Sequence, residues 1–421
     1  MNRKIIIALL LLTITGGGAL LYPRMQPSPI KVGILHSLTG TMAMSEKPVV
    51  DATMLAIDDI NAHGGLLGRQ VEAVIVDGHS DAATFAKGAE RLITQDHVAA
   101  IFGCWTSASR KMVKSVVEKH HHLLLYPVQS EGLEASPNII YTGATANQQI
   151  VPALVWAVHH LGKRIYLLGS DYIFPRSANF ILRRYAAAAG ATIVGERYIP
   201  LGSKEMAATL ADIRRTKPDV VLNTINGDSN IALFRALQRA GIRAKKLPVL
   251  SFSIGETELV NMKRQGLNLD GNYTASSYLQ SIKSTTNRTL VDAMRYRYGA
   301  NTVVNDPMEG AWIAVHLWAG AVKAAESSSI EQVLPMLKHQ TFQAPEGLVS
   351  IDADNNHLWK RLRIGRIKGQ KLTTIYRSPQ PIPPQPWPDL ISQSEADAML
   401  QSLWQRWHGH WSAPTTATLT R

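Results

Sequence analysis

The chain has 421 residues, which is long for one compact core, so two domains are the default expectation. Its composition, 45% hydrophobic and 18% charged, suits a soluble globular protein and argues against both disorder and a polytopic membrane protein. The net charge of +12 raises the question of an acidic partner. The basic residues are spread along the sequence without a dense run or a recognition motif, so no nucleic-acid partner is expected.

The amino terminus has the form of an export signal. Arg3 and Lys4 precede an apolar run from Ile5 to Tyr22. No small-residue cleavage motif follows, no cysteine is available for lipidation, and the run is barely long enough to span a bilayer. A cleaved signal peptide and an uncleaved signal anchor both fit residues 1–29, and either one places the body outside the cytoplasm.

From Ile30 onward, short β-rich runs alternate with amphipathic helical stretches. The first series predicts strands at 30–35, 71–76, 99–102 and 123–126, and helices that include 50–57, 85–92 and 106–119. A Gly64-Gly65 pair ends the first helix, and Thr106 or Ser107 is available to cap the third.

The pattern repeats after about residue 150. The second series predicts strands at 164–168, 192–194, 220–223 and 249–252, and helices at 177–189, 206–213 and 231–239. Strands that alternate with helices of this length predict parallel sheets covered on both faces. The fold class is therefore α/β, with two doubly wound parallel-sheet lobes, and functional residues are expected just after strands.

The carboxyl-terminal part changes character. Residues 378–388 are rich in proline and predict an extended strap or linker. After them, five apolar residues fall largely on one helical face: Leu400, Leu403, Trp404, Trp407 and Trp411. We expect this helix to dock on the body, with a membrane-surface or partner-binding helix as the alternative. Residues 413–421 are expected to fray.

No motif for catalysis or for a bound cofactor is present. The sequence lacks a phosphate-binding loop, a nucleophile elbow and the zinc-protease motif. His120, His121 and His122 are interpreted as a solvated stretch rather than a metal site, and Cys104 as a small buried cysteine rather than a nucleophile. We therefore expect no enzyme activity, no metal and no cofactor.

Loops that follow the expected strands carry a resemblance to a known family. The stretches concerned are LHSLTGTMA (35–43), FGCWTSASRK (102–111), LYPVQSEGLEASPNIIYTGA (125–144), GSDYIFPR (169–176), NTINGDSN (223–230) and NDPMEGAW (305–312). They resemble the urea-binding proteins of bacterial ABC transporters, which belong with amide sensors and branched-chain amino-acid receptors among type I periplasmic binding proteins. The similarity runs from about Ile30 to about Pro388.

The resemblance implies a Venus-flytrap protein of the periplasm with three crossovers between its lobes, near Thr145, Ser276 and Ala344. Lobe one would take 30–146 and 276–345, and lobe two 147–275 and 346–388, with 389–421 as a Trp-rich tail. The implied ligand is urea or a similar small neutral amide, and the implied partner is an ABC permease in the inner membrane.

Two departures from the family keep other functions open. The chain lacks a lipid-attachment cysteine, and it carries the Trp-rich tail. Both features also suit a receptor tethered to the inner membrane by an uncleaved signal, which would control a regulator or a kinase. An amidase on the same scaffold is the enzymatic alternative.

Urea needs several acceptors, a donor for its carbonyl and flat walls. Trp105 and Tyr172 follow strands of opposite lobes and are expected to form the walls. Asp228 is the expected charged acceptor, with capping of the next helix as its alternative role. Ser107 lies at a helix start, where donors point outward. The remaining candidates are Thr106, Tyr126, Gln129, Ser37, Glu256 and, more weakly, Tyr278.

Overall fold

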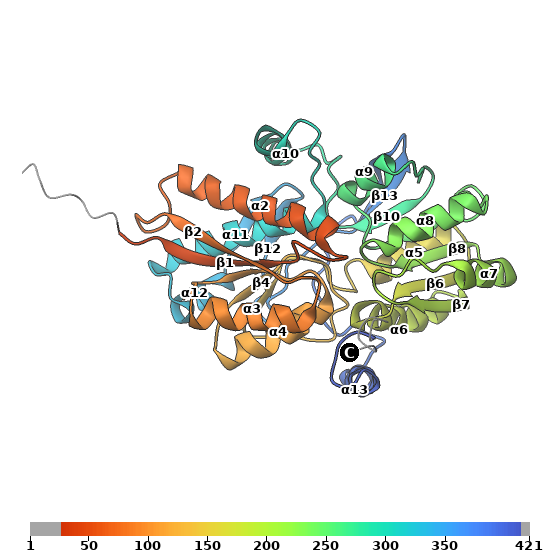
Figure 1. Ribbon diagram of the computed structural model, residues 1–421, viewed down its shortest axis with the longest axis horizontal. Helices are drawn as coiled ribbons and strands as arrows, with labels where there is room; N and C mark the ends of the chain where they lie inside the picture. Colours follow the sequence, from red (N-terminus) through yellow and green to blue (C-terminus); the bar gives the residue numbers. More distant parts are fainter. Residues whose placement is uncertain (1–26, 414–421) are drawn as a thin grey trace, which may run out of the picture.

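The computed structural model describes residues 27–413. Two α/β lobes lie side by side along the long axis of the molecule (Figure 1), so the predicted fold class is confirmed. The expected signal lies almost wholly outside the described residues, as does nearly all of the segment expected to fray. Within residues 27–413, no helix combines the length and apolarity that a membrane crossing requires.

Lobe one is built on a five-stranded parallel sheet in the order β2-β1-β3-β4-β5. Its strands are β1 (Ile30–His36), β2 (Val71–Asp77), β3 (Ile101–Gly103), β4 (Leu124–Tyr126) and β5 (Ile139–Tyr141). Its helices are α2 (Ala43–Ala62), α3 (Ala82–Thr94), α4 (Ser107–Lys119), α10 (Thr285–Tyr298), α11 (Asp306–Ala325) and α12 (Ile330–Leu337).

The central strands of lobe one are buried on both faces, which explains their continuous apolar sequence. At the carboxyl end of β3, Gly103 lies so close to β1 that an added Cβ would be 2.2 Å from the Leu35 carbonyl oxygen. Glycine there lets the chain turn directly into the loop that carries Trp105.

Lobe two is built on a seven-stranded sheet in the order β14-β13-β10-β9-β8-β6-β7. Its strands are β6 (Arg164–Ser170), β7 (Thr192–Ile199), β8 (Val220–Thr224), β9 (Val249–Ser251), β10 (Tyr273–Ser276), β13 (Arg363–Lys368) and β14 (Lys371–Arg377). Strands β6 to β10 are parallel, and the β13–β14 hairpin adds an antiparallel edge. The helices are α5 (Ile150–His160), α6 (Ile173–Ala188), α7 (Ala207–Thr216), α8 (Ser229–Arg239) and α9 (Glu256–Arg264).

The packing differs from the predicted lobe boundaries at the third crossover. A small hairpin of β11 (Thr341–Ala344) and β12 (Gly347–Ser350) precedes it. Beyond the hairpin, Ile351 and Leu358 still pack in the core of lobe one. The structure therefore places the crossing after Leu358 rather than near Ala344, because both apolar residues are buried in lobe one.

The tail docks on lobe two, as the apolar stripe predicts. Helix α13 (Gln393–Arg406) starts with a capping box between Ser392 and Glu395 and packs on α6. Leu400 and Leu403 of this helix, and Trp407 directly after it, are buried in the core of lobe two. The proline-rich segment before it forms no helix and no strand, and the Pro386 carbonyl accepts a 2.7 Å hydrogen bond from the Leu133 amide of lobe one.

Truncating the buried tail should destabilise the whole protein. The Trp407 side chain is only 3% exposed, so Trp407→Ala should lower the free energy of unfolding by about 3–5 kcal/mol. Guanidinium chloride denaturation followed by circular dichroism measures this loss. Gln401→Ala, on the exposed face of α13, is the control and should change the value by less than about 0.5 kcal/mol. Equal effects of the two substitutions would show that the tail is not docked.

Candidate functional site

The two lobes meet where the carboxyl ends of their parallel strands face each other. Several hydrogen bonds cross directly from one lobe to the other. Gln129 Nε2 donates to the Phe252 carbonyl oxygen (2.9 Å), and Ser45 Oγ donates to Glu258 Oε1 (2.8 Å). Asn305 Nδ2 donates to Thr257 Oγ1 (2.6 Å). Because these hydrogen bonds join the two lobes, the cleft between them is closed.

A small cavity of about 20 Å³ lies deep in this cleft, beside the crossovers. Lobe one contributes Trp105, Gln129 and the start of α11, and lobe two contributes the loop after β9. The third side is the end of β10, where the chain passes between the lobes. Residues from both lobes and from a crossover thus share one enclosure, which is the arrangement expected for a ligand trapped by closure.

The cavity is lined by carboxyl groups and by no basic group. Its acidic residues are Glu256, Glu258 and Asp306, and none of the described residues that line it is Lys, Arg or His. Burial raises the pKa of the Asp306 carboxyl to about 6, and this group accepts a hydrogen bond from the Tyr278 amide at 2.7 Å. Glu258 accepts the bond from Ser45 and a second one from the Gly255 amide.

Glu256 is the acidic group with an unused oxygen. Its Oε1 accepts a hydrogen bond from the Gln280 amide at 2.7 Å, whereas its buried Oε2 has no partner among the described residues. Burial raises the pKa of the Glu256 carboxyl to about 8, and the nearby Asp306 adds to this shift. At neutral pH the group is therefore mostly protonated, and it offers one O–H donor together with acceptor capacity.

Aromatic side chains form the walls of the cavity, namely Trp105, Phe252 and Tyr278. A hydrogen bond of 2.6 Å, which the Tyr126 hydroxyl donates to the Trp105 carbonyl oxygen, fixes the loop that carries Trp105. The Tyr278 hydroxyl donates to Asn287 Oδ1, which fixes the ring against α10. Flat walls held in this way suit a planar ligand.

Four of the sequence candidates line this cavity: Trp105, Gln129, Glu256 and Tyr278. Trp105 and Tyr172 do not form the expected pair of walls, because only Trp105 lines the cavity. Tyr172 lies in the core of lobe two at the start of α6, and its hydroxyl accepts a hydrogen bond from Asn226 Nδ2 at 2.8 Å. Tyr278 and Phe252 are the aromatic groups found with Trp105 instead.

Asp228 also lies away from the cavity. It stands at the start of α8 as expected, but its side chain makes no capping hydrogen bond. The half-buried carboxyl lines a surface hollow with Lys204, between α7 and α8. The helical backbone conformation of Asp228 (φ −61°, ψ −23°) explains the missing cap, since a capping residue normally has an extended backbone.

The remaining candidates make bonds within lobe one. Thr106 caps α4, because its Oγ1 accepts the Ser109 amide at 3.0 Å. Ser37 Oγ accepts the Ser80 amide at 2.9 Å. Ser107 is fully buried and donates its hydroxyl to Glu131 Oε2 at 2.5 Å. Its hydroxyl is therefore already bonded within the protein.

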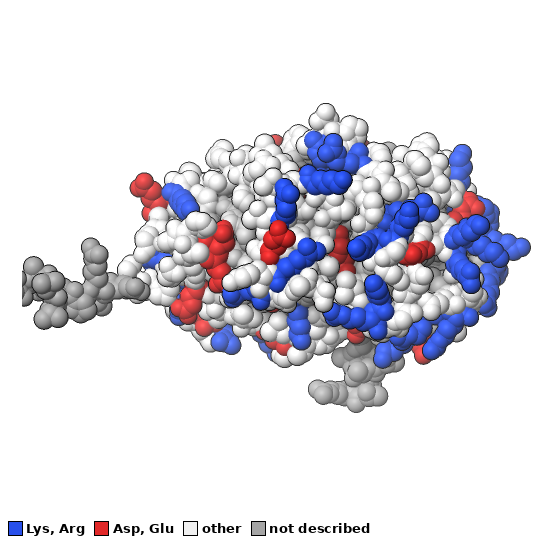
Figure 2. Space-filling view, turned by 90° about the horizontal axis from the view of Figure 1, so that it is seen from above, with Lys and Arg blue, Asp and Glu red and all other residues white. Residues whose placement is uncertain are grey.

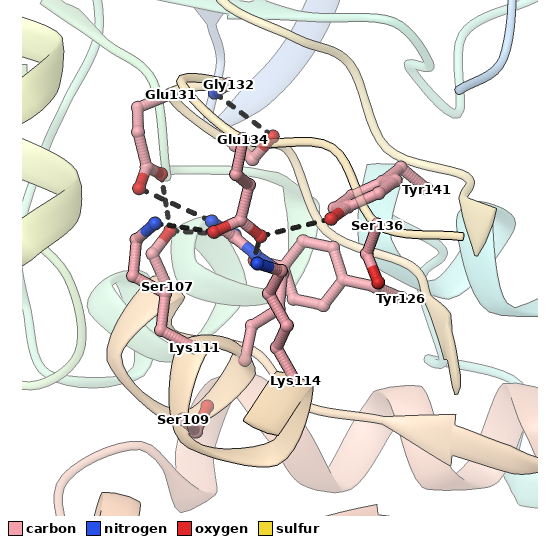
Figure 3. A network of polar contacts seen from close by, with 12 residues as sticks. Ser107, Ser109, Lys111, Lys114, Tyr126, Glu131, Gly132, Glu134, Ser136 and Tyr141 are labelled. Carbon is pink, nitrogen blue, oxygen red and sulfur yellow. Dashed lines mark hydrogen bonds and ion pairs between the residues drawn. The ribbon is translucent and has the colours of Figure 1, made fainter. Parts of the chain in front are cut away.

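Ser107 belongs to a buried charge network that the sequence reasoning missed (Figure 3). Arg110, on α4, is completely buried and contacts Glu131 at 3.3 Å and Glu134 at 2.8 Å. Lys111 Nζ contacts the other Glu134 oxygen at 2.5 Å. Burial opposes ionisation of the Glu134 carboxyl, but the neighbouring Arg110 and Lys111 hold the pKa of this group well below its usual range.

The network fixes the position of the loop after β4, which carries Gln129 and, directly after it, Glu131 and Glu134. Figure 3 shows Glu131 and Glu134 reaching from the loop after β4 toward α4. Two cations face two carboxylates there, so the buried charges balance. The signal in the sequence was the pair Arg110-Lys111, followed by two acidic residues in the next strand-end loop.

Comparison with known proteins decides the family. Residues 30–393 match the model of the periplasmic binding protein domain. The chain belongs to the periplasmic binding protein family.

Among relatives of this periplasmic binding protein, Leu/Ile/Val-binding protein homolog 8 of Brucella abortus (strain 2308) is 25% identical over 375 residues, 82% of this chain and 90% of the relative. A protein of Geobacillus stearothermophilus named limonene hydroxylase is 34% identical over 118 residues, which are 28% of this chain and only 21% of that protein. The relatives that match most of the chain are thus named as solute-binding proteins, and the enzyme name rests on a short segment.

Solved structures share the fold of this periplasmic binding protein. The solute-binding protein of an ABC transporter from R. palustris, in complex with 4-hydroxybenzoate, has a TM-score of 0.74 at 21% identity and covers 83% of this chain and 96% of its own. The branched-chain amino acid substrate-binding protein of Streptococcus pneumoniae, in complex with isoleucine, has a TM-score of 0.72 at 22% identity, with 83% and 98% covered.

The histidine stretch of this periplasmic binding protein is only partly solvated, which corrects the sequence interpretation. His122 is buried, and its Nε2 lies 2.8 Å from the Val98 carbonyl oxygen, because the chain turns inward to start β4. His120 pairs with Glu90 at 2.8 Å. Within residues 27–413, no cluster of three or more His, Cys, Asp or Glu side chains is arranged to hold a metal. Cys104 is buried as expected, and burial raises the pKa of its thiol.

Replacing the cavity carboxyl Glu256 should stabilise this periplasmic binding protein at neutral to alkaline pH. The folded-state pKa of about 8 lies above the ordinary value of 4.5, so between these values the unfolded chain releases a proton that the folded chain keeps. Wild-type stability should fall over this range by up to about 1.4 kcal/mol per pH unit. Glu256→Gln removes this loss, so its advantage should grow from pH 4.5 to pH 8 and then level off.

Guanidinium chloride denaturation at a series of pH values measures the difference. Glu205→Gln, at an exposed carboxyl, is the matched control and should show no such dependence on pH. A constant difference between Glu256→Gln and wild type at every pH would contradict the assignment of a buried, mostly protonated Glu256.

Proposed function

We propose that this periplasmic binding protein captures urea or a similar short neutral amide by closing its lobes, and presents it to an ABC permease in the inner membrane. The observation that carries the proposal is the charge of the cavity. Three carboxyl groups line it, and none of its described lining residues is basic.

A ligand with a carboxylate would lack a counter-ion in this cavity. Burying an unpaired carboxylate costs several kcal/mol, and neighbouring acidic groups add repulsion. The 4-hydroxybenzoate and isoleucine held by the similar structures both carry a carboxylate. At 21–22% identity the shared fold does not transfer those ligands to this chain.

Urea matches the groups that the cavity offers. It has four N–H donors and one carbonyl acceptor. The unpartnered Glu256 Oε2 can accept one of these donors, and a protonated Glu256 can donate to the carbonyl. Trp105 and Tyr278 supply flat walls. The closed cavity has a volume of only about 20 Å³, so it is too small for a bulky ligand.

The same closure would also serve a sensor that passes the signal to a regulator or kinase. An uncleaved anchor, one of the two interpretations of residues 1–29, would favour this alternative, and that segment lies almost wholly outside the described residues. Neighbouring genes discriminate between the two functions. Permease and ATPase genes support transport, whereas a lone kinase or regulator gene supports sensing.

Calorimetry tests the ligand class directly. Urea and acetamide should release heat on binding, whereas benzoate and leucine should not. Trp105→Ala removes a wall of the cavity and should weaken binding by about tenfold to a hundredfold. Trp359→Ala, at a partly exposed tryptophan outside the cavity, is the matched control and should bind as wild type does. Binding of benzoate or leucine without binding of any amide would refute the proposal.

A further inference from the structure

The positive charge of the chain is concentrated in one lobe. Residues 147–275 contain 17 Lys and Arg against 9 Asp and Glu, whereas residues 30–146 contain 9 against 12. Figure 2 shows the basic side chains gathered over the end of the molecule that carries lobe two. The basic residues that are spread along the sequence are therefore brought together by the fold.

Many of these side chains lie at the amino ends of the lobe-two strands. We call this surface the basic end face and define it by Lys163, Lys217, Arg243, Lys245, Lys246, Arg366 and Lys368. All seven are exposed, and none forms an ion pair with another described residue. Because the parallel strands of lobe two run toward the cleft, their amino ends form the surface farthest from it.

Two acidic side chains of this region accept hydrogen bonds from backbone amides. Asp219 Oδ2 accepts hydrogen bonds from the Lys163 and Arg164 amides, both at 2.9 Å. The Asp270 carboxylate accepts from the amides of the hairpin turn that follows Lys368, at 3.1 and 2.9 Å. These carboxylates hold turns in place instead of pairing with the lysines, so the positive charge faces outward.

A surface hollow concentrates this charge further. Lys245 and Lys246 line one side of it, and Arg366 and Lys368 line another. Four side-chain cations thus surround one hollow, within reach of a common anionic surface or group.

We propose that the basic end face of lobe two docks on the anionic phospholipid headgroups of a membrane surface. The face offers few of the apolar and aromatic anchors on which protein interfaces depend, since no exposed large apolar residue lies in the segments that form it and Tyr273, the one aromatic ring of Phe, Tyr or Trp that lines the hollow, is half-buried. Clustered exposed cations are sufficient for a surface of phosphodiester groups, and each Lys or Arg near such a surface strengthens binding by about fivefold.

Docking in this orientation is compatible with a working cleft. The face lies at the end of lobe two opposite to the cavity, so a membrane there covers neither Trp105 nor Glu256. One lobe would be held at the membrane while the other remains able to move. The inference does not depend on which solute the cleft takes.

Vesicle cosedimentation of the full chain tests the proposal. Vesicles of phosphatidylcholine alone are compared with vesicles that contain about 30% phosphatidylglycerol, at low salt and at about 0.5 M NaCl. We expect binding that requires phosphatidylglycerol and is lost at high salt. Apolar insertion through the amino terminus would not depend on phosphatidylglycerol, so the difference between the two vesicles isolates the electrostatic contribution.

Two variants with equal changes in charge locate the contact. The test variant neutralises four lysines of the basic end face, Lys163→Gln, Lys245→Gln, Lys246→Gln and Lys368→Gln. The control variant neutralises four exposed lysines of lobe one, Lys31→Gln, Lys87→Gln, Lys323→Gln and Lys338→Gln. The first should reduce phosphatidylglycerol-dependent binding at least about tenfold, and the second should leave it near wild type.

Three outcomes would overturn the proposal. They are binding that does not depend on phosphatidylglycerol, equal losses in the two variants, and binding of heparin or an acidic protein without binding of vesicles. Circular dichroism of both variants shows that any loss reflects surface charge rather than unfolding.

Discussion

The carboxyl ends of the parallel strands in both lobes point toward one cleft, and the site depends on this constraint. Loops at that edge carry polar backbone and side-chain groups, and closure buries many of them, so each needs a partner. Some of these groups form hydrogen bonds between the lobes: Gln129 donates to the Phe252 carbonyl, and Ser45 donates to Glu258. The cavity lies where this pairing is incomplete, beside the unused oxygen of Glu256.

The buried carboxylates that support the site are paired with cations, whereas the carboxyl group Glu256 of the site is not. Arg110 and Lys111 balance the two carboxylates of the loop behind Gln129. At the third crossover, Lys360 pairs with Glu346 and lies 3.7 Å from Glu309, which ties the crossing segment to α11. Buried pairs of this kind hold specific loop positions, although they add little net stability. Glu256 has no such cation, and this difference marks it as a group available to a ligand.

Alternation of apolar runs with amphipathic helices was sufficient to predict both lobes and most of their strands. Strands β5 and β10 were not predicted, and the antiparallel β13–β14 edge was missed because charged residues interrupt its apolar ones. Trp105, Gln129 and Glu256 were found because each lies a few residues after the end of a strand. Tyr172 and Asp228 also follow strands, but side-chain direction depends on local backbone conformation, which the sequence pattern does not contain.

Crystal structures of the protein grown with urea and, in parallel, with benzoate would show which of the two ligands the cavity binds. We expect urea between Trp105 and Tyr278, with a nitrogen or its carbonyl oxygen within hydrogen-bond distance of Glu256 Oε2, and no benzoate in the cavity. Benzoate bound beside Glu256, or urea bound elsewhere while the cavity stays closed, would contradict it.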